Sequence, residues 1–402
     1  MIIELKFRNF LSFKDETCFL MTRVNSFKEH LDSNVIKIDR EFELLKVSAI
    51  YGANGSGKSN FINAMHAMSY FVFNSFSNSL KKEEEKDLQN FSFKLNSQTE
   101  KANTMFEVSF LENSIIYRYG FEINNNEIKK EWLFRKNERE VNLFTRDNNI
   151  FNINQESFQE GEKYKNDVNS NVLLISHLAQ NNQSIARTVF GWFSKVNVIS
   201  GLYDLNYNKF TATLLETDSN FKKWASIALK YLEITNIEAG EKEGEIITYH
   251  NKYDENNLLI DSVAFNSKME SDGTKKLIHI LGPIYDTLKL GRVLFIDEFD
   301  SKLHPSLSKK LIELFQTFNI NGAQLVFSAH DTTLLDKNLF RRDQIWFVEK
   351  DQFGTSSLYS LSEFDAKTVR NTSAFDKKYL ANEFGAADSL EIGKNLMDLL
   401  YA

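Results

Sequence analysis

Residues 44–65 read LLKVSAIYGANGSGKSNFINAM and are the most informative stretch of the chain. The first seven of them, 44–50, are mostly apolar and run up to a glycine, which predicts a buried strand. Residues 52–59, GANGSGKS, match the pattern G-x-x-x-x-G-K-S, and apolar residues at helical spacing follow to about Phe76. A strand, a glycine loop and a helix in this order are the context in which the pattern predicts a phosphate-binding site.

Each residue type in this loop has a physical role in holding phosphate. Glycines let the backbone curl so that several N–H groups point at one anion, and the helix that starts near Lys58 adds the positive end of its dipole. Lys58 can reach the β- and γ-phosphates of ATP, and the Ser59 hydroxyl can ligate Mg²⁺. The nucleotide-binding residues expected here are Gly52, Ala53, Asn54, Gly55, Ser56, Gly57, Lys58, Ser59 and Asn60.

The composition limits the possible classes of protein. The chain has 402 residues, of which 42% are hydrophobic and 26% charged, so it can bury a large core. A net charge of −7 predicts no general attraction to nucleic acid, although a local basic groove is compatible with it. The single cysteine, Cys18, excludes an internal disulfide and favours a reducing, cytoplasmic compartment, and we expect its thiol to be buried and inert. We see no signal peptide and no run of about 18 apolar residues, so no membrane segment is expected.

The periodicity of the chain changes between regions. Residues 91–147 alternate between apolar and polar positions, with asparagine-rich breaks, and predict an antiparallel meander. Helical patterns at 171–180, 184–193 and 221–232 predict a helical insertion, and strand-like residues follow at 246–249 and 258–265. The expected organisation is an N-terminal part of the fold at 1–149, the helical insertion at 150–245 and a C-terminal part at 246–402.

A second motif stands at residues 292–298, RVLFIDE. An apolar run that ends in two acids predicts a buried parallel strand with carboxylates at its C-terminal edge, where α/β sheets place their ligands. Asp297 is the candidate partner of Mg²⁺, and Glu298 is the candidate general base for the attacking water. By itself this motif is weak evidence for a nucleotide-binding site, and it becomes strong evidence when the same chain also contains the glycine loop.

Two further segments carry candidate residues. Residues 270–274, ESDGT, precede a helix expected over 275–290. Ser271 and Gly273 would offer a hydroxyl and a backbone N–H to an anion at a helix start, and an ordinary N-cap explains the same residues equally well. Residues 324–330, QLVFSAH, predict a buried strand followed by His330, whose ring can hydrogen-bond a γ-phosphate.

The order of these motifs resembles the ABC-type ATPase head of SMC and RecF proteins. The opening residues 8–13, RNFLSF, are similar to the N-terminal strand of that family, which implies that Arg8 and Asn9 approach the nucleotide. In that family two heads enclose two ATP molecules. The resemblance therefore implies that Ser271 and Gly273 contact the nucleotide held by a second copy, and that Asp300 lies at the dimer interface.

The C-terminal third narrows the resemblance. The segments 303–305 (LHP), 343–350 (DQIWFVEK), 358–361 (LYSL) and 379–386 (YLANEFGA) are similar to AAA-family ATPases of the RloA/AbiLi type, relatives of the ATPase half of OLD-family nucleases. This resemblance implies a role in bacterial anti-phage defence by abortive infection, beside a separate effector. OLD proteins carry a TOPRIM nuclease after this region. Only residues 386–402 follow here, so we expect any nuclease to be a separate polypeptide.

The sequence thus predicts an α/β fold: an ABC-type ATPase head, made of a P-loop sheet and an antiparallel β-subdomain, with a helical insertion. The expected cofactors are ATP and Mg²⁺, and ATP-dependent pairing of heads, as a homodimer or higher homo-oligomer, would control the effector. The expected catalytic residues are Glu298, His330 and Lys58, and the expected metal ligands are Ser59 and Asp297.

Two alternatives stay open at this point. One is a RecF/SMC-like ATPase that binds DNA in repair or chromosome maintenance, and the other is a scaffold that binds ATP and hardly turns over. The turn S-D-G-T differs from the L-S-G-G-Q of transporters and argues against a transporter subunit. The glutamine loop of such ATPases is unassigned, with Gln89 and Gln98 as candidates.

Overall fold

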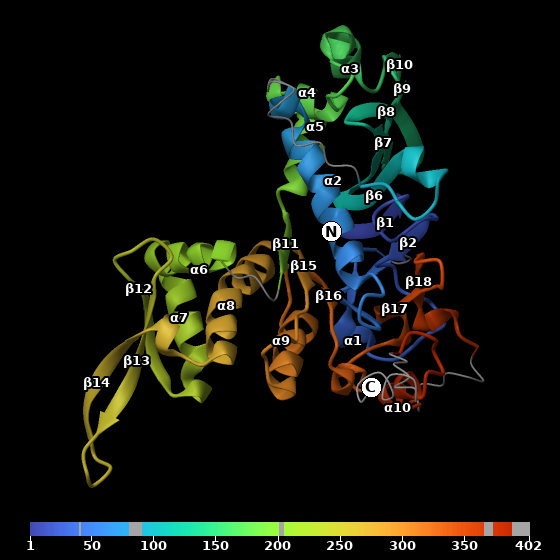
Figure 1. Ribbon diagram of the computed structural model, residues 1–402. Coiled ribbons are helices and arrows are strands. Elements are labelled where there is room, and N and C mark those ends of the chain that lie inside the picture. The colour runs from blue at the N-terminus through green and yellow to red at the C-terminus, as the bar shows by residue number, and fades with distance from the viewer. Residues whose placement is uncertain (40–41, 80–90, 201–204, 366–372, 388–402) are drawn as a thin grey trace, which may run out of the picture.

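The computed structural model describes residues 1–39, 42–79, 91–200, 205–365 and 373–387. Two large sheets dominate it, one wholly antiparallel and one mostly parallel, with helices packed between and beside them (Figure 1). The α/β fold class predicted from the sequence is therefore confirmed. Among the residues that the structure describes, no helix combines the length and the hydrophobicity needed to cross a membrane.

The antiparallel sheet has seven strands in the order β10-β9-β8-β7-β6-β1-β2. The strands are β1 (Ile2–Arg8), β2 (Thr17–Leu20), β6 (Thr104–Glu112), β7 (Ile115–Asn124), β8 (Glu127–Lys136), β9 (Glu140–Asp147) and β10 (Ile150–Ile153). The predicted meander is confirmed from β6 to β9, whereas residues 91–93 form no strand. β1 pairs with β6 in this sheet, and no pattern in the sequence indicates that pairing.

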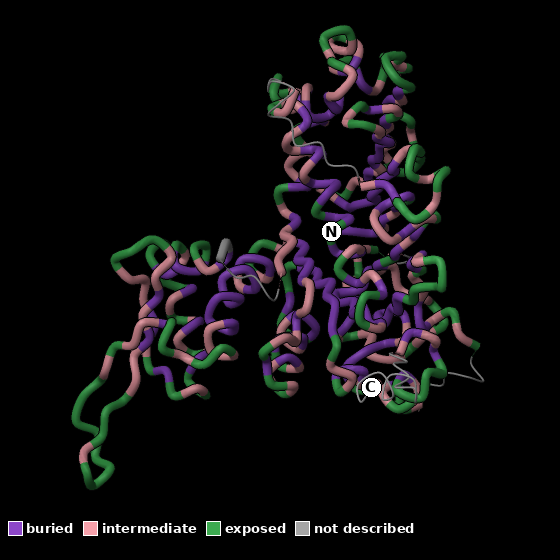
Figure 2. Tube along the Cα trace, viewed as in Figure 1, coloured by how far each residue is buried: buried purple, intermediate pink, exposed green. Residues whose placement is uncertain are grey.

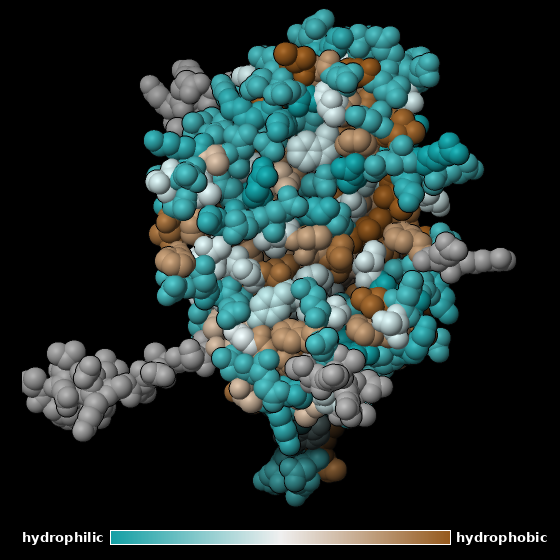
Figure 3. All heavy atoms as spheres, turned by 90° about the vertical axis from the view of Figure 1, so that its right-hand side faces the viewer, coloured by the Kyte–Doolittle hydropathy of each residue, from teal (hydrophilic) through white to brown (hydrophobic). Residues whose placement is uncertain are grey.

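The two faces of this sheet differ because side chains alternate along each strand. Apolar side chains of β6 and β7 face a core that they share with α2 (Lys58–Ser79), α4 (Leu174–Gln180) and α5 (Ser184–Phe193). The opposite face carries ion pairs, among them Lys6 with Glu107 and Arg118 with both Glu107 and Glu140. Figure 3 views this side of the molecule, where hydrophilic residues predominate over the upper part.

Cys18 lies on β2 and is partly exposed, which corrects the expectation of a buried thiol. Burial of part of the side chain and the neighbouring Glu4 carboxylate, 3.3 Å from the sulfur, raise the pKa of this thiol to about 12. The thiol therefore stays protonated at neutral pH, which suits an unreactive cysteine.

The second sheet has the order β11-β15-β16-β5-β17-β18, and all neighbours are parallel except β17 and β18. Its strands are β5 (Val47–Gly52), β11 (Val196–Ser200), β15 (Val293–Asp297), β16 (Gln324–Ser328), β17 (Ile345–Lys350) and β18 (Ser356–Ser360). The strand expected over 44–50 begins only at Val47. Leu44 and Leu45 belong instead to β4 (Glu43–Leu45), which pairs with β3 (Val35–Lys37). Lys46 separates β4 from β5, and its ammonium donates to the Gln316 carbonyl oxygen.

Helices cover both faces of this parallel sheet. Alternate side chains of β15, Val293 and Phe295, pack on the side of α2, whereas Leu294 and Ile296 pack on the side of α8 (Asp272–Leu290) and α9 (Pro305–Thr317). The result is a three-layer arrangement with one apolar core on each side of the sheet. Figure 2 shows buried residues along both sheets and through the helices between them.

A third group of elements projects from the molecule beside α8 (Figure 1). It consists of α6 (Leu205–Thr217), α7 (Ser219–Leu229) and a three-stranded sheet of β12 (Ile234–Ala239), β13 (Ile246–Tyr253) and β14 (Leu259–Asn266). The outer half of the β13–β14 hairpin is exposed (Figure 2). Shorter helices elsewhere are α1 (Leu31–Asn34), α3 (Gln159–Tyr164) and α10 (Phe375–Leu380).

Residues 150–245 contain the helices expected of an insertion, but they also supply one strand to each of three sheets. β10 extends the antiparallel sheet, β11 forms an edge of the parallel sheet, and β12 opens the three-stranded sheet. The boundaries at 150 and 245 stay a proposal about domains.

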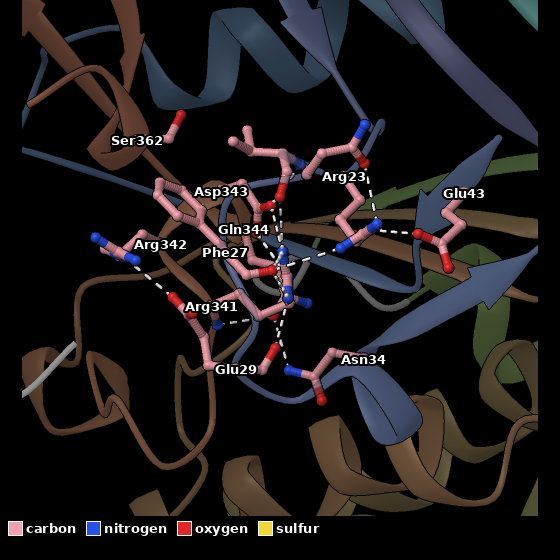
Figure 4. Close-up of polar contacts among 12 residues, drawn as sticks. Arg23, Phe27, Glu29, Asn34, Glu43, Arg341, Arg342, Asp343, Gln344 and Ser362 are labelled. Carbon is pink, nitrogen blue, oxygen red and sulfur yellow. Dashed lines mark hydrogen bonds and ion pairs between the residues drawn. The ribbon is translucent and has the colours of Figure 1, made fainter. Parts of the chain in front are cut away.

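A buried arginine fixes the segment that leads into the parallel sheet (Figure 4). Arg341 is fully buried and pairs with Asp343 at 2.7 Å, and its guanidinium also donates to the carbonyl of Glu29. The next side chain, Gln344, bonds both Asn34 and the Val47 carbonyl. This network joins the N-terminal segment to the first residue of β5, the strand that carries the glycine loop.

Candidate nucleotide-binding site

The glycine loop lies between the end of β5 and the start of α2, as the sequence predicts. Gly52 passes so close to β17 that a Cβ there would lie 2.3 Å from the Val348 carbonyl oxygen. Gly57 has φ +122°, and a Cβ there would lie 2.5 Å from Ser356 Oγ and 2.8 Å from Ser12 Oγ. Neither position can accept a side chain without moving its neighbours, so the loop geometry requires glycine at these two positions of the pattern.

Lys58 and Ser56 have the environment of phosphate-binding groups. Lys58 is mostly buried, and its Nζ curls back over the loop to donate to the carbonyls of Gly52 (2.7 Å) and Ala53 (3.0 Å). The Ser56 hydroxyl is buried and finds no partner among the described residues. Buried polar groups are almost always satisfied, so a phosphate oxygen fits beside this hydroxyl. Asn54, Gly55 and Ser59 are exposed on the outer side of the loop.

Two serines that sequence reasoning missed hold the loop in place. A chain of hydrogen bonds runs from Asn60 Nδ2 to Ser12 Oγ (2.8 Å), on to Ser356 Oγ (2.8 Å), and from there to the Ser56 carbonyl oxygen (2.5 Å). Ser12 stands inside the RNFLSF segment and could have been found there. Ser356 follows a turn that leads into β18 and has no local sequence signal.

Arg8 and Asn9, the two residues expected near the nucleotide, direct their side chains elsewhere. Arg8 pairs with Glu122 of β7 at 3.3 Å. The Asn9 amide is buried, donates to carbonyls of residues 99–103 and accepts from the Phe93 N–H. In this structure the segment reaches the loop through Ser12 instead, and a contact of Arg8 or Asn9 with nucleotide stays a prediction.

The candidate acids lie at the same sheet edge as the glycine loop. β15 and β16 run parallel to each other, and β16 runs parallel to β5, so the three strand ends are neighbours. Ser328 ties the acids together, because its hydroxyl donates to Asp297 Oδ1 (2.6 Å) and accepts from the Glu298 N–H (2.8 Å). Glu298 has φ +52°, a left-handed conformation that is uncommon outside glycine.

His330 and Asp300 meet in the turn after β16. Asp300 Oδ2 accepts from the backbone N–H groups of His330 (2.9 Å) and Asp331 (2.5 Å), and the His330 ring is exposed. Asp300 Oδ1 is buried and has no partner among the described residues. Asp300 thus holds this turn within its own chain, and the role expected for it at a dimer interface stays a prediction.

The S-D-G-T turn forms the start of α8. Ser271 is the N-cap, and its hydroxyl accepts from the Thr274 N–H at 3.2 Å, so the simple capping interpretation holds within one chain. Ser271 is also exposed. Gly273 packs so tightly that a Cβ there would lie 2.6 Å from the Lys302 carbonyl oxygen. The turn is therefore fixed against the loop that follows Asp297 and Glu298.

The two glutamine candidates are not resolved by the fold. Gln98 is exposed and its N–H bonds the Asn96 side chain, whereas Gln89 lies outside the described residues. Mg²⁺ is commonly held by one or two protein oxygens together with phosphate. The Ser59 hydroxyl and the Asp297 carboxylate are oxygen donors of the kind that Mg²⁺ prefers, and their role as its ligands stays a prediction.

Comparisons with known proteins give one matching family and similar solved structures. A family model described as "AAA domain, putative AbiEii toxin, Type IV TA system" matches residues 47–336, more than half of the chain. One similar solved structure is the SMC head domain from Thermotoga maritima, with 15% identity and a TM-score of 0.44 over 89% of this chain and 98% of that one. Another is an SMC head bound to the C-winged helix domain of ScpA, with 13% identity and a TM-score of 0.45 over 92% of this chain and 99% of that one. No curated protein matches the chain.

Proposed function

Because the chain belongs to the family described as "AAA domain, putative AbiEii toxin, Type IV TA system", we propose that it is an ABC-type ATPase that binds and hydrolyses ATP. One observation carries this proposal. A glycine loop with a buried lysine folded over it lies at the same sheet edge as Asp297 and Glu298. This is the arrangement that phosphoryl transfer to water requires.

Each residue has a role in the proposed reaction. Lys58 and the loop N–H groups bind the β- and γ-phosphates, and Ser59 and Asp297 hold the cation, which neutralises phosphate charge when bound. Glu298 accepts a proton from the attacking water. The water oxygen forms a bond to the γ-phosphorus while the bond from that phosphorus to the β–γ bridging oxygen breaks, which gives ADP and phosphate. His330, exposed at the end of β16, donates to a γ-phosphate oxygen.

The proposal extends to pairing of two heads. An exposed Ser271 at a helix N-terminus can contact a γ-phosphate held by a second copy, with Gly273 beside it and Asp300 at the junction. Bound ATP would then stabilise the closed pair, because it contacts both chains only in that state. The resemblance to RloA/AbiLi-type ATPases supports a further step: this cycle controls a separate effector, such as a TOPRIM nuclease, in cytoplasmic anti-phage defence.

Two variants test the enzymatic proposal with purified protein. We expect Lys58→Ala to lose ATP binding in a fluorescent-nucleotide titration, because it removes the charge that faces the phosphates. Glu298→Gln should bind ATP with the parental affinity and release phosphate about 10²–10⁴-fold more slowly, the usual contribution of a general base. Parental turnover by Glu298→Gln would refute the role of base, and absence of ATP binding by the parent would refute the function.

A further inference from the structure

Helix α8 joins the S-D-G-T turn of residues 271–274, which we call the candidate signature turn, to the candidate base within one chain. Its first turn contains Gly273, whose Cα packs so close to the Lys302 carbonyl oxygen that no side chain would fit between them. Its next turn contains Lys276, a lysine with only 2% of its surface exposed. The Lys276 ammonium donates to the backbone carbonyl oxygen of Glu298 at 2.9 Å. The start of α8 is thus attached directly to the residue proposed to activate water.

A lysine is an unusual choice at this position. The neighbours of Lys276 on the buried side of α8, Leu277 and Ile280, belong to the apolar core under the parallel sheet. Burying an ammonium group costs free energy unless hydrogen bonds compensate, so burial of this kind usually marks a specific task. The bond to the Glu298 carbonyl oxygen gives this ammonium one such partner, and that partner belongs to the candidate base.

Two hydrogen bonds, one at the N–H and one at the carbonyl oxygen, hold the backbone of Glu298. Its left-handed backbone, φ +52°, persists only where the surroundings hold it. Ser328 accepts a bond from its N–H at 2.8 Å, and Lys276 donates a bond to its carbonyl oxygen. Because the backbone conformation sets the direction in which a side chain leaves the chain, these two bonds also set where the Glu298 carboxylate lies.

We propose that Lys276 is a positioning residue, which holds Glu298 for catalysis and links it to the signature turn. This inference rests on the proposed ATPase function and adds a means of regulation to it. When Ser271 and Gly273 engage a nucleotide held by a second copy, the start of α8 becomes fixed. Lys276 then carries this constraint to Glu298 of its own chain.

The test compares three variants on one helix in two backgrounds. Lys276→Met keeps roughly the length of the side chain and removes the hydrogen-bond donor, and Lys276→Arg restores a donor. The control, Lys289→Met, removes an exposed lysine in the last turn of α8 that pairs with Asp218. Each is made in the parental protein and in Glu298→Gln. ATP affinity, the single-turnover rate of phosphate release and the thermal unfolding midpoint are measured for all of them.

We expect Lys276→Met to bind ATP within about twofold of the parent and to hydrolyse it at least about tenfold more slowly, because only the arrangement of the reacting groups is lost. Lys276→Arg should recover most of the rate, and Lys289→Met should match the parent. In the Glu298→Gln background, Lys276→Met should change the rate by less than about twofold, because a residue that acts through Glu298 has nothing left to position.

Equal losses in both backgrounds would mean that Lys276 only supports the fold, and a parental rate for Lys276→Met would overturn the inference outright. Both results leave the ATPase proposal standing, whereas a parent that neither binds nor hydrolyses ATP removes both. If Lys276→Met does not fold, Lys276→Leu, which likewise carries no hydrogen-bond donor, is tested against the same outcomes.

Discussion

Ser356 holds the phosphate loop from outside the motif. Its hydroxyl lies within hydrogen-bond distance of the Ser56 carbonyl oxygen and the Ser12 hydroxyl, and its Oγ occupies the space that a side chain at Gly57 would need. The loop therefore owes its shape to its glycines and to this serine together.

Removing this hydroxyl should weaken nucleotide binding without unfolding the protein. Ser356→Ala loses a bond of about 1 kcal/mol that fixes the loop, so we expect ATP affinity to fall about fivefold. The measurement is a fluorescent-nucleotide titration, and Ser357→Ala, at the exposed neighbouring position, is the matched control. Equal affinities for the two variants would contradict the role given to Ser356.

Local sequence patterns identify the candidate phosphate-binding and catalytic residues, but not the residues that position them. Lys58, Asp297 and Glu298 each stand in a short motif whose spacing predicts its structure. Ser328 and Lys276 contact Glu298 from other elements, across 30 and 22 positions of sequence. A contact that depends on how two elements pack leaves no periodic signal in either of them.

At the scale of elements, helix α4 donates its N-terminal hydrogen bonds to a side chain of a neighbouring strand. Its N-cap residue, Leu173, offers no side-chain acceptor. Glu131 of β8 accepts instead from the N–H groups of Leu174 (2.7 Å) and Ile175 (3.2 Å), and it also faces the buried Arg146 at 3.7 Å. One carboxylate thus joins the antiparallel sheet to the helical layer.

We expect Glu131→Ala to destabilise the protein by about 3–5 kcal/mol, because it leaves the Arg146 charge buried without its partner. Urea unfolding followed by circular dichroism measures the change. Glu127→Ala on the same strand removes an exposed carboxylate that pairs with Lys129, and it should cost less than about 0.5 kcal/mol. A loss for Glu131→Ala as small as that of the control would contradict this account.

Elements with a strong period were predictable and short strands were not. The helix expected over 184–193 coincides with α5, and the strand expected within 292–298 is β15, Val293–Asp297. β11 and β12, by contrast, lie within residues 150–245, where the sequence predicts a helical insertion. β11 spans only Val196–Ser200 and is a strand because it pairs with β15, far along the chain. Such pairing overrides local preference.

At the scale of the whole molecule, most charges of the antiparallel sheet are neutralised locally. Lys6, Arg8, Arg118 and Lys130 each pair with a glutamate on this face. These four cations therefore have acidic partners, and the net charge of the whole chain is −7.

We expect ATP to convert the protein from monomer to dimer when hydrolysis is slowed. Glu298→Gln with ATP and Mg²⁺ should elute with twice the monomer mass in light scattering, because the bound nucleotide contacts both chains. Adding Ser271→Arg to that variant should restore the monomer, since the larger side chain blocks the contact with the second nucleotide. ADP in place of ATP is the control, and a dimer that persists with Ser271→Arg would contradict the proposed interface.

The two serines that close the phosphate loop stand 344 positions apart in the sequence. On the ribosome the glycine loop therefore emerges long before Ser356, and before β16 and β17, between which β5 must lie. At ordinary rates of translation this delay is on the order of tens of seconds, during which an apolar strand waits unpaired and open to chaperones. A nascent or C-terminally shortened chain lacks the support of the loop and should not hold ATP. Stable nucleotide binding is therefore expected only after β16 and β17 have been synthesised and paired with β5.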